Sequence, residues 1–134
     1  MNPVRVLLVD DSPVFLDAAA NFLLRHAHVQ VVGRARNGAE GVHLSRQLAP
    51  DLVLMDLAMP GMNGLAATRE IKAHAPTTCV VIVTLHDDPE YRRGAIDARA
   101  DGFVHKAQFG DIVLSLIAAL PRRPTSAPPS EEPR

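Results

Sequence analysis

Polar side chains that could do chemistry end or directly follow four apolar segments of this chain. In chain order they are Asp10, Asp11, Asp56, Thr84 and Lys106. A cluster of carboxylates repels itself unless a hard cation binds, and Mg²⁺ takes one or two carboxylates together with waters and a phosphate. An aspartate can also act as a nucleophile that forms an aspartyl phosphate, while hydroxyl and ammonium groups bind phosphoryl oxygens. These residue types indicate magnesium-dependent phosphoryl chemistry if the fold gathers them.

The elements that must position these side chains are short, apolar and rich in β-branched residues. The predicted strands are Val4–Val9, Val29–Val32, Leu52–Met55, Cys79–Thr84 and Gly102–Val104. The first, third and fourth are apolar nearly throughout, which is typical of parallel strands covered on both faces. Helical periodicity fills the segments between them, so the order is a strand and a helix repeated five times. The pattern predicts a doubly wound α/β fold, a five-stranded parallel sheet in a three-layer α/β/α arrangement.

In such a sheet, ligands bind beyond the carboxyl ends of the strands. Each residue of the set is unremarkable when taken singly, because an aspartate after a strand is a common loop or cap residue and a lone lysine is commonly a solvated charge. Their joint occurrence at four strand ends is what predicts a site.

Helix boundaries and faces follow from capping residues and apolar spacing. In the first helix, the predicted buried face is Phe15, Ala18, Ala19, Phe22 and Leu23; in the last it is Ile112, Val113, Leu116, Ile117 and Leu120. The predicted caps are Ser12, Asn37, Asn63 and Asp88. The fourth helix, roughly residues 89–98, has few apolar anchors, namely Tyr91, Ala95, Ile96 and Ala98. Low burial of that helix would suit a movable output surface or a merely peripheral element.

Composition narrows the function classes. Aromatic residues make up only 4% of the 134 residues against 47% hydrophobic residues, so the core must be aliphatic. A formal charge of −1 argues against a nucleic-acid surface and against an anionic membrane. No apolar run approaches the roughly 20 residues that cross a bilayer, which predicts a soluble, cytoplasmic protein. The single cysteine, Cys79, excludes an internal disulfide and is expected to be buried and inert, and the histidines lack metal-site spacing.

Two parts of the chain differ in composition. Residues 1–120 carry all the apolar periodicity and are predicted to form one domain. Residues 121–134 contain five prolines with serine, threonine and charged residues, which predicts a disordered tail or linker.

The segments that carry the polar set resemble the receiver domain of bacterial response regulators, the CheY-like, flavodoxin-like fold, over residues 3 to about 120. The matching segments are Val6–Ser12, Asp51–Gly64, Val83-Thr84 and Ala100–Lys106. Within them, Met59–Gly64, together with His86–Tyr91, resembles the NarL/LuxR-type subfamily in particular. In that subfamily most full-length members are transcription regulators with a C-terminal helix-turn-helix domain.

The resemblance implies a role for each matching residue. Asp56 would accept a phosphoryl group from a histidine kinase. Asp11, Asp56 and the backbone carbonyl of Ala58 would hold Mg²⁺, for which Mn²⁺ can substitute, and Asp10 would act through water. The remaining roles fall to Lys106, which would pair with the phosphoryl group, to Thr84 as the switch hydroxyl, and to Phe103 as the aromatic that turns inward.

The resemblance also implies partners. They are a cognate sensor histidine kinase and a homodimer formed on phosphorylation, with output through a DNA-binding domain absent from this chain. Direct DNA binding and membrane binding by the chain itself are not expected. Nor is an enzyme expected, beyond slow self-phosphorylation and dephosphorylation.

Three positions depart from the family pattern. Ala107 stands where proline usually follows the lysine, Leu85 where a small residue usually follows the switch hydroxyl, and Arg99 where glycine is usual.

Two other functions stay open. A pseudo-receiver would be an interaction module that never takes phosphate, which Leu85 and Ala107 keep under consideration. An aspartate-nucleophile phosphatase would need an Asp-x-Asp after the first strand, where this chain has the adjacent pair Asp10-Asp11.

Overall fold

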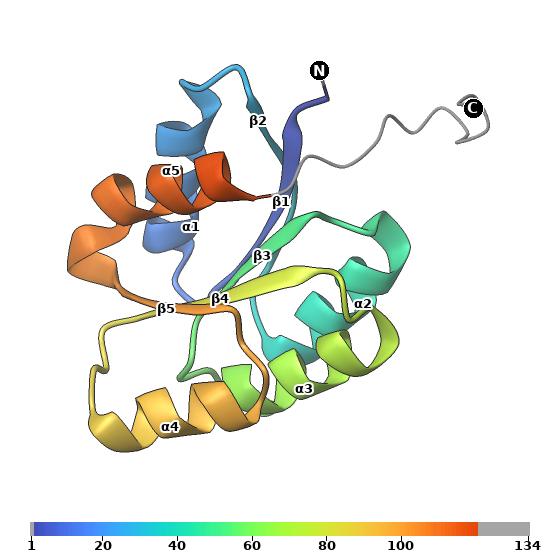
Figure 1. Ribbon diagram of the computed structural model, residues 1–134, viewed down its shortest axis with the longest axis vertical. Coiled ribbons are helices and arrows are strands. Elements are labelled where there is room, and N and C mark those ends of the chain that lie inside the picture. The colour runs from blue at the N-terminus through green and yellow to red at the C-terminus, as the bar shows by residue number, and fades with distance from the viewer. Residues whose placement is uncertain (1, 121–134) are drawn as a thin grey trace.

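The computed structural model describes residues 2–120, and the tail predicted over residues 121–134 lies outside them. Strands and helices alternate along the described chain (Figure 1). The elements are β1 (Val4–Val9), α1 (Pro13–Leu24), β2 (Val29–Ala35), α2 (Gly38–Leu48), β3 (Leu52–Met55), α3 (Gly64–His74), β4 (Cys79–Thr84), α4 (Pro89–Asp97), β5 (Gly102–His105), the short 3₁₀ helix η1 (Lys106–Gln108) and α5 (Phe109–Ala119). Three strands have the predicted bounds, whereas β2 runs three residues and β5 one residue further than predicted.

The strands form one parallel sheet in the order β2-β1-β3-β4-β5. Figure 1 shows α1 and α5 together on one face, with α2, α3 and α4 on the other. The chain moves from β1 outward to β2 and then returns to the opposite side of β1 to form β3. Strand order therefore reverses between β1 and β3, and the predicted doubly wound α/β fold is confirmed.

Two aliphatic cores lie on either side of the sheet. Residues of β1, β3 and β4 contribute to both, since successive side chains point to opposite faces. Leu8 and Leu54 pack against α1 and α5, whereas Val53 and Ile82 pack towards α2, α3 and α4. The near-continuous burial of these three strands confirms that helices cover the sheet on both faces.

The buried faces of two helices differ in part from the predicted ones. In α1 the buried residues are Leu16, Ala19, Ala20 and Leu23, so the stripe is rotated by about one position from the predicted one and Ala18 is exposed. In α5 the buried residues are Phe109, Val113 and Ile117. The predicted face omits Phe109 because this residue precedes the periodic stretch. Its ring forms T-shaped pairs with two α1 rings, Phe15 at 5.4 Å and Phe22 at 5.9 Å between ring centroids.

Helix capping follows the sequence at three of four sites. The side chains of Ser12, Asn37 and Asn63 each accept a bond from a first-turn backbone N–H, as predicted. The prediction for Asp88 is wrong, because its side chain makes no capping bond. Its backbone carbonyl still accepts the first helical bond from the Arg92 N–H at 3.1 Å, so α4 begins there without a side-chain cap.

Helix α4 is the least buried of the five α-helices described. Within it only Ala95 is buried, and Ile96 is 74% exposed. The sparse apolar spacing of this segment correctly predicted a weakly held helix. Nowhere in residues 2–120 does a helix reach the length and apolar character needed to cross a membrane.

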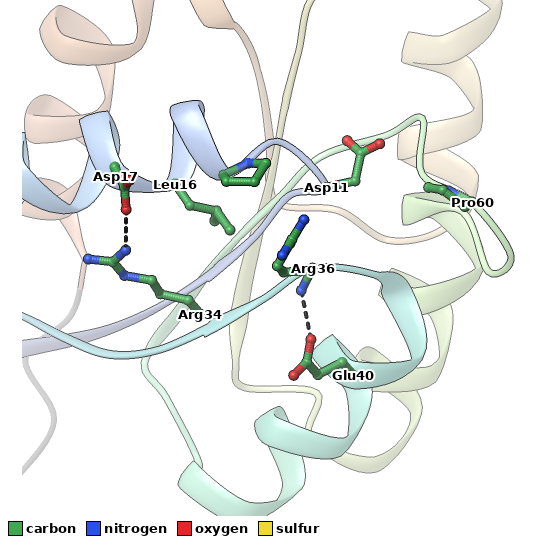
Figure 2. Close-up of a pocket in the computed structure, with 8 residues that line it drawn as sticks. Asp11, Leu16, Asp17, Arg34, Arg36, Glu40 and Pro60 are labelled. Atoms are coloured by element: carbon green, nitrogen blue, oxygen red, sulfur yellow. Dashed lines mark hydrogen bonds and ion pairs between the residues drawn. The ribbon is translucent and has the colours of Figure 1, made fainter.

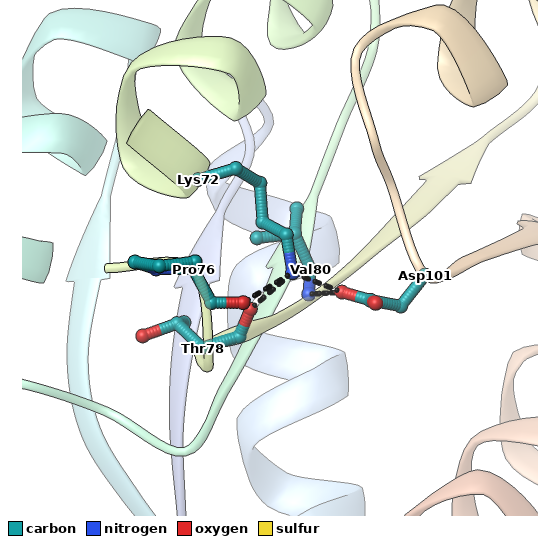
Figure 3. Close-up of polar contacts among 5 residues, drawn as sticks. All are labelled: Lys72, Pro76, Thr78, Val80 and Asp101. Carbon is teal, nitrogen blue, oxygen red and sulfur yellow. Dashed lines mark hydrogen bonds and ion pairs between the residues drawn. The ribbon is translucent and has the colours of Figure 1, made fainter. Parts of the chain in front are cut away.

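A buried lysine, Lys72, lies at the edge of the sheet where the strands begin and makes several polar contacts there (Figure 3). The Lys72 ammonium donates to the carbonyls of Pro76 at 3.1 Å and Thr78 at 2.9 Å, and to Asp101 Oδ2 at 2.9 Å. The same carboxylate oxygen accepts the Val80 N–H at 2.8 Å. The network ties the end of α3 to the starts of β4 and β5.

The cysteine at this edge behaves only partly as predicted. Cys79 is half-buried rather than fully buried. Burial, helped by the nearby Asp101 carboxylate, raises the pKa of its thiol to about 11. The group therefore stays protonated at neutral pH, which agrees with the predicted low reactivity.

Candidate functional site

The carboxyl edge of the sheet gathers the three aspartates of the predicted site. Val9 of β1 pairs with Met55 of β3, so the residues that follow them, Asp10 and Asp56, lie side by side. The Asp56 N–H donates to the Val9 carbonyl at 2.8 Å and extends this pairing. Ligand atoms of Asp10, Asp11 and Asp56 all lie within 4.8 Å of one another. Asp10 and Asp56 are buried, whereas Asp11 faces solvent.

Lys106 comes to the same edge from the end of β5. Its ammonium lies 2.8 Å from Asp10 Oδ2 and 3.7 Å from Asp56 Oδ1. The Lys106 side chain is only 13% exposed, so both ion pairs lie in a largely desolvated setting. Four of the five predicted site residues are thus brought together by segments nearly one hundred positions apart.

Hydrogen bonding at Asp10 is incomplete. Its Oδ1 accepts the Ser12 N–H at 2.9 Å. Its Oδ2 is fully buried and receives no hydrogen bond from the described residues, since its contact with Lys106 is an ion pair without hydrogen-bond geometry. The Lys106 ammonium offsets the charge of this oxygen, and a water bound to a cation would donate the hydrogen bond that it lacks. The all-oxygen donor set of the cluster is the kind that Mg²⁺ prefers.

The pKa of the Asp56 carboxyl also indicates a site that a cation would stabilise. Burial, followed by repulsion from Asp10, raises the pKa of the Asp56 carboxyl from 3.8 to about 6, although Lys106 acts in the opposite direction. The carboxyl group is therefore harder to ionise than an ordinary aspartate. A divalent ion among the three carboxylates would favour the ionised form.

Thr84 and Phe103 lie on β4 and β5, the two strands that follow β3 in the sheet. Thr84 ends β4, is fully buried, and its Oγ1 accepts the His86 N–H at 3.1 Å. Phe103 lies on β5 opposite Ile82 and is half-buried against the core beneath α4. The guanidinium of Arg92 covers its ring, 4.6 Å from the centroid.

A groove of about 600 Å³ opens over the Asp56 and Lys106 side chains. It is lined by Asp11, Ser12, Val14, Phe15, Ala18, Asp56, Ala58, Leu85, His86, Lys106 and Ala107. Two of the departures from the family pattern, Leu85 and Ala107, lie on its wall, and Leu85 is 64% exposed. The third departure, Arg99, has a left-handed backbone with φ of 70°, which is the conformation that glycine adopts without strain.

A second pocket, of about 540 Å³, lies on the other side of Asp11 (Figure 2). There Arg34 pairs with Asp17 at 2.7 Å, and Glu40 accepts the backbone N–H of Arg36 at 2.8 Å. The acidic cluster therefore borders two pockets of different character. The groove over Asp56 and Lys106 is lined mainly by apolar side chains, whereas the second pocket contains two guanidinium groups.

One residue of the site was missed at the sequence level. The Lys106 ammonium lies 4.4 Å from the centre of the Phe15 ring. Apolar spacing predicts only that Phe15 lies on the core face of its helix. No spacing pattern links positions 15 and 106, so this contact follows only from the packing of α1 beside β5.

Residues 6–117 match the family model of the response regulator receiver domain. The chain belongs to this family. It is 32% identical over 126 residues to the nitrate/nitrite response regulator protein NarL of Escherichia coli, covering 84% of this chain and 58% of that protein. It is 38% identical over 111 residues to a protein-glutamate methylesterase/protein-glutamine glutaminase of Methanospirillum hungatei, covering 81% of this chain and 32% of that protein.

A solved structure supports the same subfamily. A two-component response regulator of the LuxR family from Aurantimonas superposes with a TM-score of 0.80 at 30% identity, covering 98% of this chain and 95% of that one. The predicted NarL/LuxR-type resemblance is confirmed by these relatives. The chain spans about a third to somewhat over half of the length of the two curated relatives. The methylesterase shows that some relatives combine this domain with an enzyme.

Proposed function

We propose that this chain accepts a phosphoryl group on Asp56 from a cognate sensor histidine kinase and uses the added charge to switch its surface. The observation that supports this best is the meeting of Asp10, Asp11 and Asp56 within 4.8 Å, with the Lys106 ammonium 2.8 and 3.7 Å from two of them. In the transfer, an Asp56 carboxylate oxygen forms a bond to phosphorus as the bond from phosphorus to the histidine nitrogen breaks. The electron pair of the broken bond stays on the imidazole, which takes up a proton, so the reaction leaves an aspartyl phosphate and a neutral histidine.

The residues present fit a bound Mg²⁺, with Mn²⁺ as a substitute. Asp11, Asp56 and the backbone carbonyl of Ala58 would hold it, and Asp10 would bind it through water. The incomplete hydrogen bonding of Asp10 and the raised pKa of Asp56 support this assignment. When bound, the ion supplies charge neutralisation for the carboxylates and the incoming phosphoryl oxygens.

The chain's own residues would then respond to the phosphoryl group. Its charge of about −2 attracts the Lys106 ammonium away from Asp10, and the Thr84 hydroxyl donates to a second oxygen. Movement of Thr84 frees space into which the half-buried Phe103 ring turns. Because α4 buries only Ala95, this helix is the element that can shift at least cost.

We further propose that the output is transcriptional. The NarL-type subfamily supports a DNA-binding domain that follows this receiver in a longer protein, with residues 1–120 as the receiver domain and 121–134 as the linker. Phosphorylation would promote a homodimer in the cytoplasm, and the chain alone would bind neither DNA nor membrane. A gel shift showing tight, sequence-specific DNA binding by these 134 residues would contradict this.

The test is uptake of phosphate by the purified chain. Incubation with acetyl phosphate and Mg²⁺ should add the mass of one phosphoryl group, and beryllofluoride should shift the amide resonances around Asp56. Asp56→Asn should abolish both effects. Asp97→Asn, a matched change on the exposed face of α4, should leave both intact.

Two outcomes would favour the other functions. The exposed Leu85 side chain on the groove wall favours a pseudo-receiver, and an unmodified wild-type chain would support it. A modification that survives Asp56→Asn would contradict the proposed acceptor. Rapid turnover of a small phosphomonoester would instead support a phosphatase.

A further inference from the structure

The Lys106 ammonium is held from two sides. The carboxylates of Asp10 and Asp56 lie on one side, at 2.8 and 3.7 Å, and the ring of Phe15 lies on the other, 4.4 Å from ammonium to centroid. All of these groups except Asp10 line the same groove. The Phe15 ring therefore forms part of the wall of the groove along which a phosphoryl donor would approach.

The face of an aromatic ring attracts a cation because its π electrons make the face negative. The attraction strengthens as water is removed, and the Lys106 side chain is only 13% exposed. A long lysine side chain without such a partner would gain rotational freedom and solvation by swinging outwards. The Phe15 ring opposes that movement.

The ring itself is firmly placed. It forms a T-shaped pair with the Phe109 ring, at a centroid distance of 5.4 Å and an interplanar angle of 83°. Phe109 is buried in the core on the α1 and α5 side, and Phe22 packs on it at 5.9 Å. The support for Phe15 thus comes from the rigid interior, while its free face is turned to the ammonium.

Phe15 lies at the border of the packed face of α1. The buried stripe of α1 consists of Leu16, Ala19, Ala20 and Leu23, and Phe15 lies beside that stripe, half-buried. Phe22 offers a natural comparison, because it forms a T-shaped pair with Phe109 as Phe15 does, whereas the cation–π contact of Lys106 within the described part of the chain is with Phe15.

We propose that Phe15 is a positioning residue for phosphoryl transfer: its ring keeps the Lys106 ammonium beside Asp56, from where it can leave Asp10 and meet the incoming phosphoryl oxygens. The role rests on the proposed function. The ring does not touch the reacting atoms and acts only through the lysine.

The sharpest test changes the charge of the ring face without changing its shape. Phenylalanine at position 15 would be replaced by analogues with increasing fluorination, and beryllofluoride affinity in Mg²⁺ would be measured with the rate of phosphorylation by acetyl phosphate. Affinity and rate should fall steadily with fluorination. Phe15→Leu should lower them by about three- to thirtyfold, whereas Phe15→Tyr should stay close to wild type.

Phe22→Leu is the matched control, since it removes a ring from the same aromatic group without touching the lysine. It should lower thermal stability about as much as Phe15→Leu yet leave beryllofluoride affinity within about twofold of wild type. A direct structural readout is the NMR shift of the Lys106 ε-methylene protons in unphosphorylated protein. The ring current should move these protons upfield in wild type, Phe15→Tyr and Phe22→Leu, and not in Phe15→Leu.

The outcomes separate this role from the proposed function. Wild-type protein that takes up neither beryllofluoride nor phosphate would overturn both. Normal uptake by wild type, with a flat response to fluorination or equal losses in Phe15→Leu and Phe22→Leu, would overturn the role of Phe15 alone. An unshifted Lys106 methylene signal in wild type would do the same.

Discussion

Two lysines lie at opposite edges of this sheet, Lys72 buried and Lys106 half-buried, and the completeness of their hydrogen bonding differs. At the edge where the strands begin, Lys72 donates to two carbonyls and to Asp101, and its partner oxygen also accepts a backbone N–H. At the edge where the strands end, Lys106 contacts two carboxylates and a ring, and Asp10 Oδ2 receives no hydrogen bond from the described residues.

The difference separates a structural ion pair from one prepared for a ligand. The Lys72 network is complete, so a new charge there would find no free partner and would only disrupt it. At the Lys106 site three carboxylates lie around one ammonium group, and burial of Asp56, followed by repulsion from Asp10, raises the pKa of the Asp56 carboxyl. A cation and a phosphoryl group would complete this site. Incomplete neutralisation costs stability, as is common where a site serves function.

The largest expected effect comes from removing the charge of Asp56, at the edge of the sheet that carries Lys106. In metal-free protein, Asp56 has a pKa of about 6 when folded against an ordinary 3.8, so the folded state holds the proton more tightly. The free energy of unfolding should therefore fall as pH rises from 3.8 through about 6, by about 2–3 kcal/mol in total. Asp56→Asn should lack this loss and be the more stable protein at pH 8. Urea unfolding in EDTA across this pH range measures both.

Added Mg²⁺ provides the control for this prediction. It should raise the stability of wild type at pH 8 by binding the folded state, and should do so far less in Asp56→Asn. Equal pH dependence of the two proteins in EDTA would contradict the electrostatic picture of this edge.

The second prediction concerns the complete network. Lys72→Met should lower the free energy of unfolding by about 2 kcal/mol, because it leaves two carbonyls and a carboxylate without their donor. The effect is moderated because the Asp101 side chain is 41% exposed and water can reach it. Beryllofluoride affinity in Mg²⁺ should not change. Lys106→Met should show the reverse profile, with affinity lowered at least about tenfold and a smaller stability loss in Mg²⁺. Similar profiles for the two variants would remove the distinction between the edges.

A smaller effect is expected in the turn that brings Asp101 to Lys72. Arg99 has φ of 70°, so Arg99→Gly should stabilise the fold by about 1 kcal/mol without affecting the phosphoryl site. Arg99→Ala is the control and should give no such gain, since alanine carries the same steric cost. Thermal unfolding of the three proteins decides this, and a gain in the alanine variant would point to the charge of Arg99 instead.

The smallest effect concerns the access of a phosphoryl donor to the groove over Asp56 and Lys106. Leu85 is 64% exposed on the wall of the groove, so Leu85→Ala should change the free energy of unfolding by no more than about 0.5 kcal/mol. A wider groove should speed both phosphorylation by acetyl phosphate and later loss of the phosphate, by roughly twofold each. Unchanged rates would show that Leu85 does not limit access.

The sequence alone determined that the chain forms five parallel strands and that Asp10, Asp56, Thr84 and Lys106 end or follow four of them. Strand periodicity is a local property, and the nearly continuous apolar runs of β1, β3 and β4 are typical of a parallel sheet covered on both faces. Because parallel strands end at a common edge, the meeting of Asp10, Asp56 and Lys106 followed from the order of elements. The capping of helix N-termini by Ser12, Asn37 and Asn63 was likewise predicted from the sequence, because a cap is a local feature.

Tertiary structure decided what depends on the angle between packed elements. The rotation of the α1 stripe, the burial of Phe109 and the contact of Phe15 with Lys106 all depend on how α1 and α5 lie against the sheet. The incomplete hydrogen bonding of Asp10 and the raised pKa of Asp56 likewise depend on distances and desolvation. Spacing along a chain carries no such information, because these energies arise between side chains that only the folded packing brings into contact.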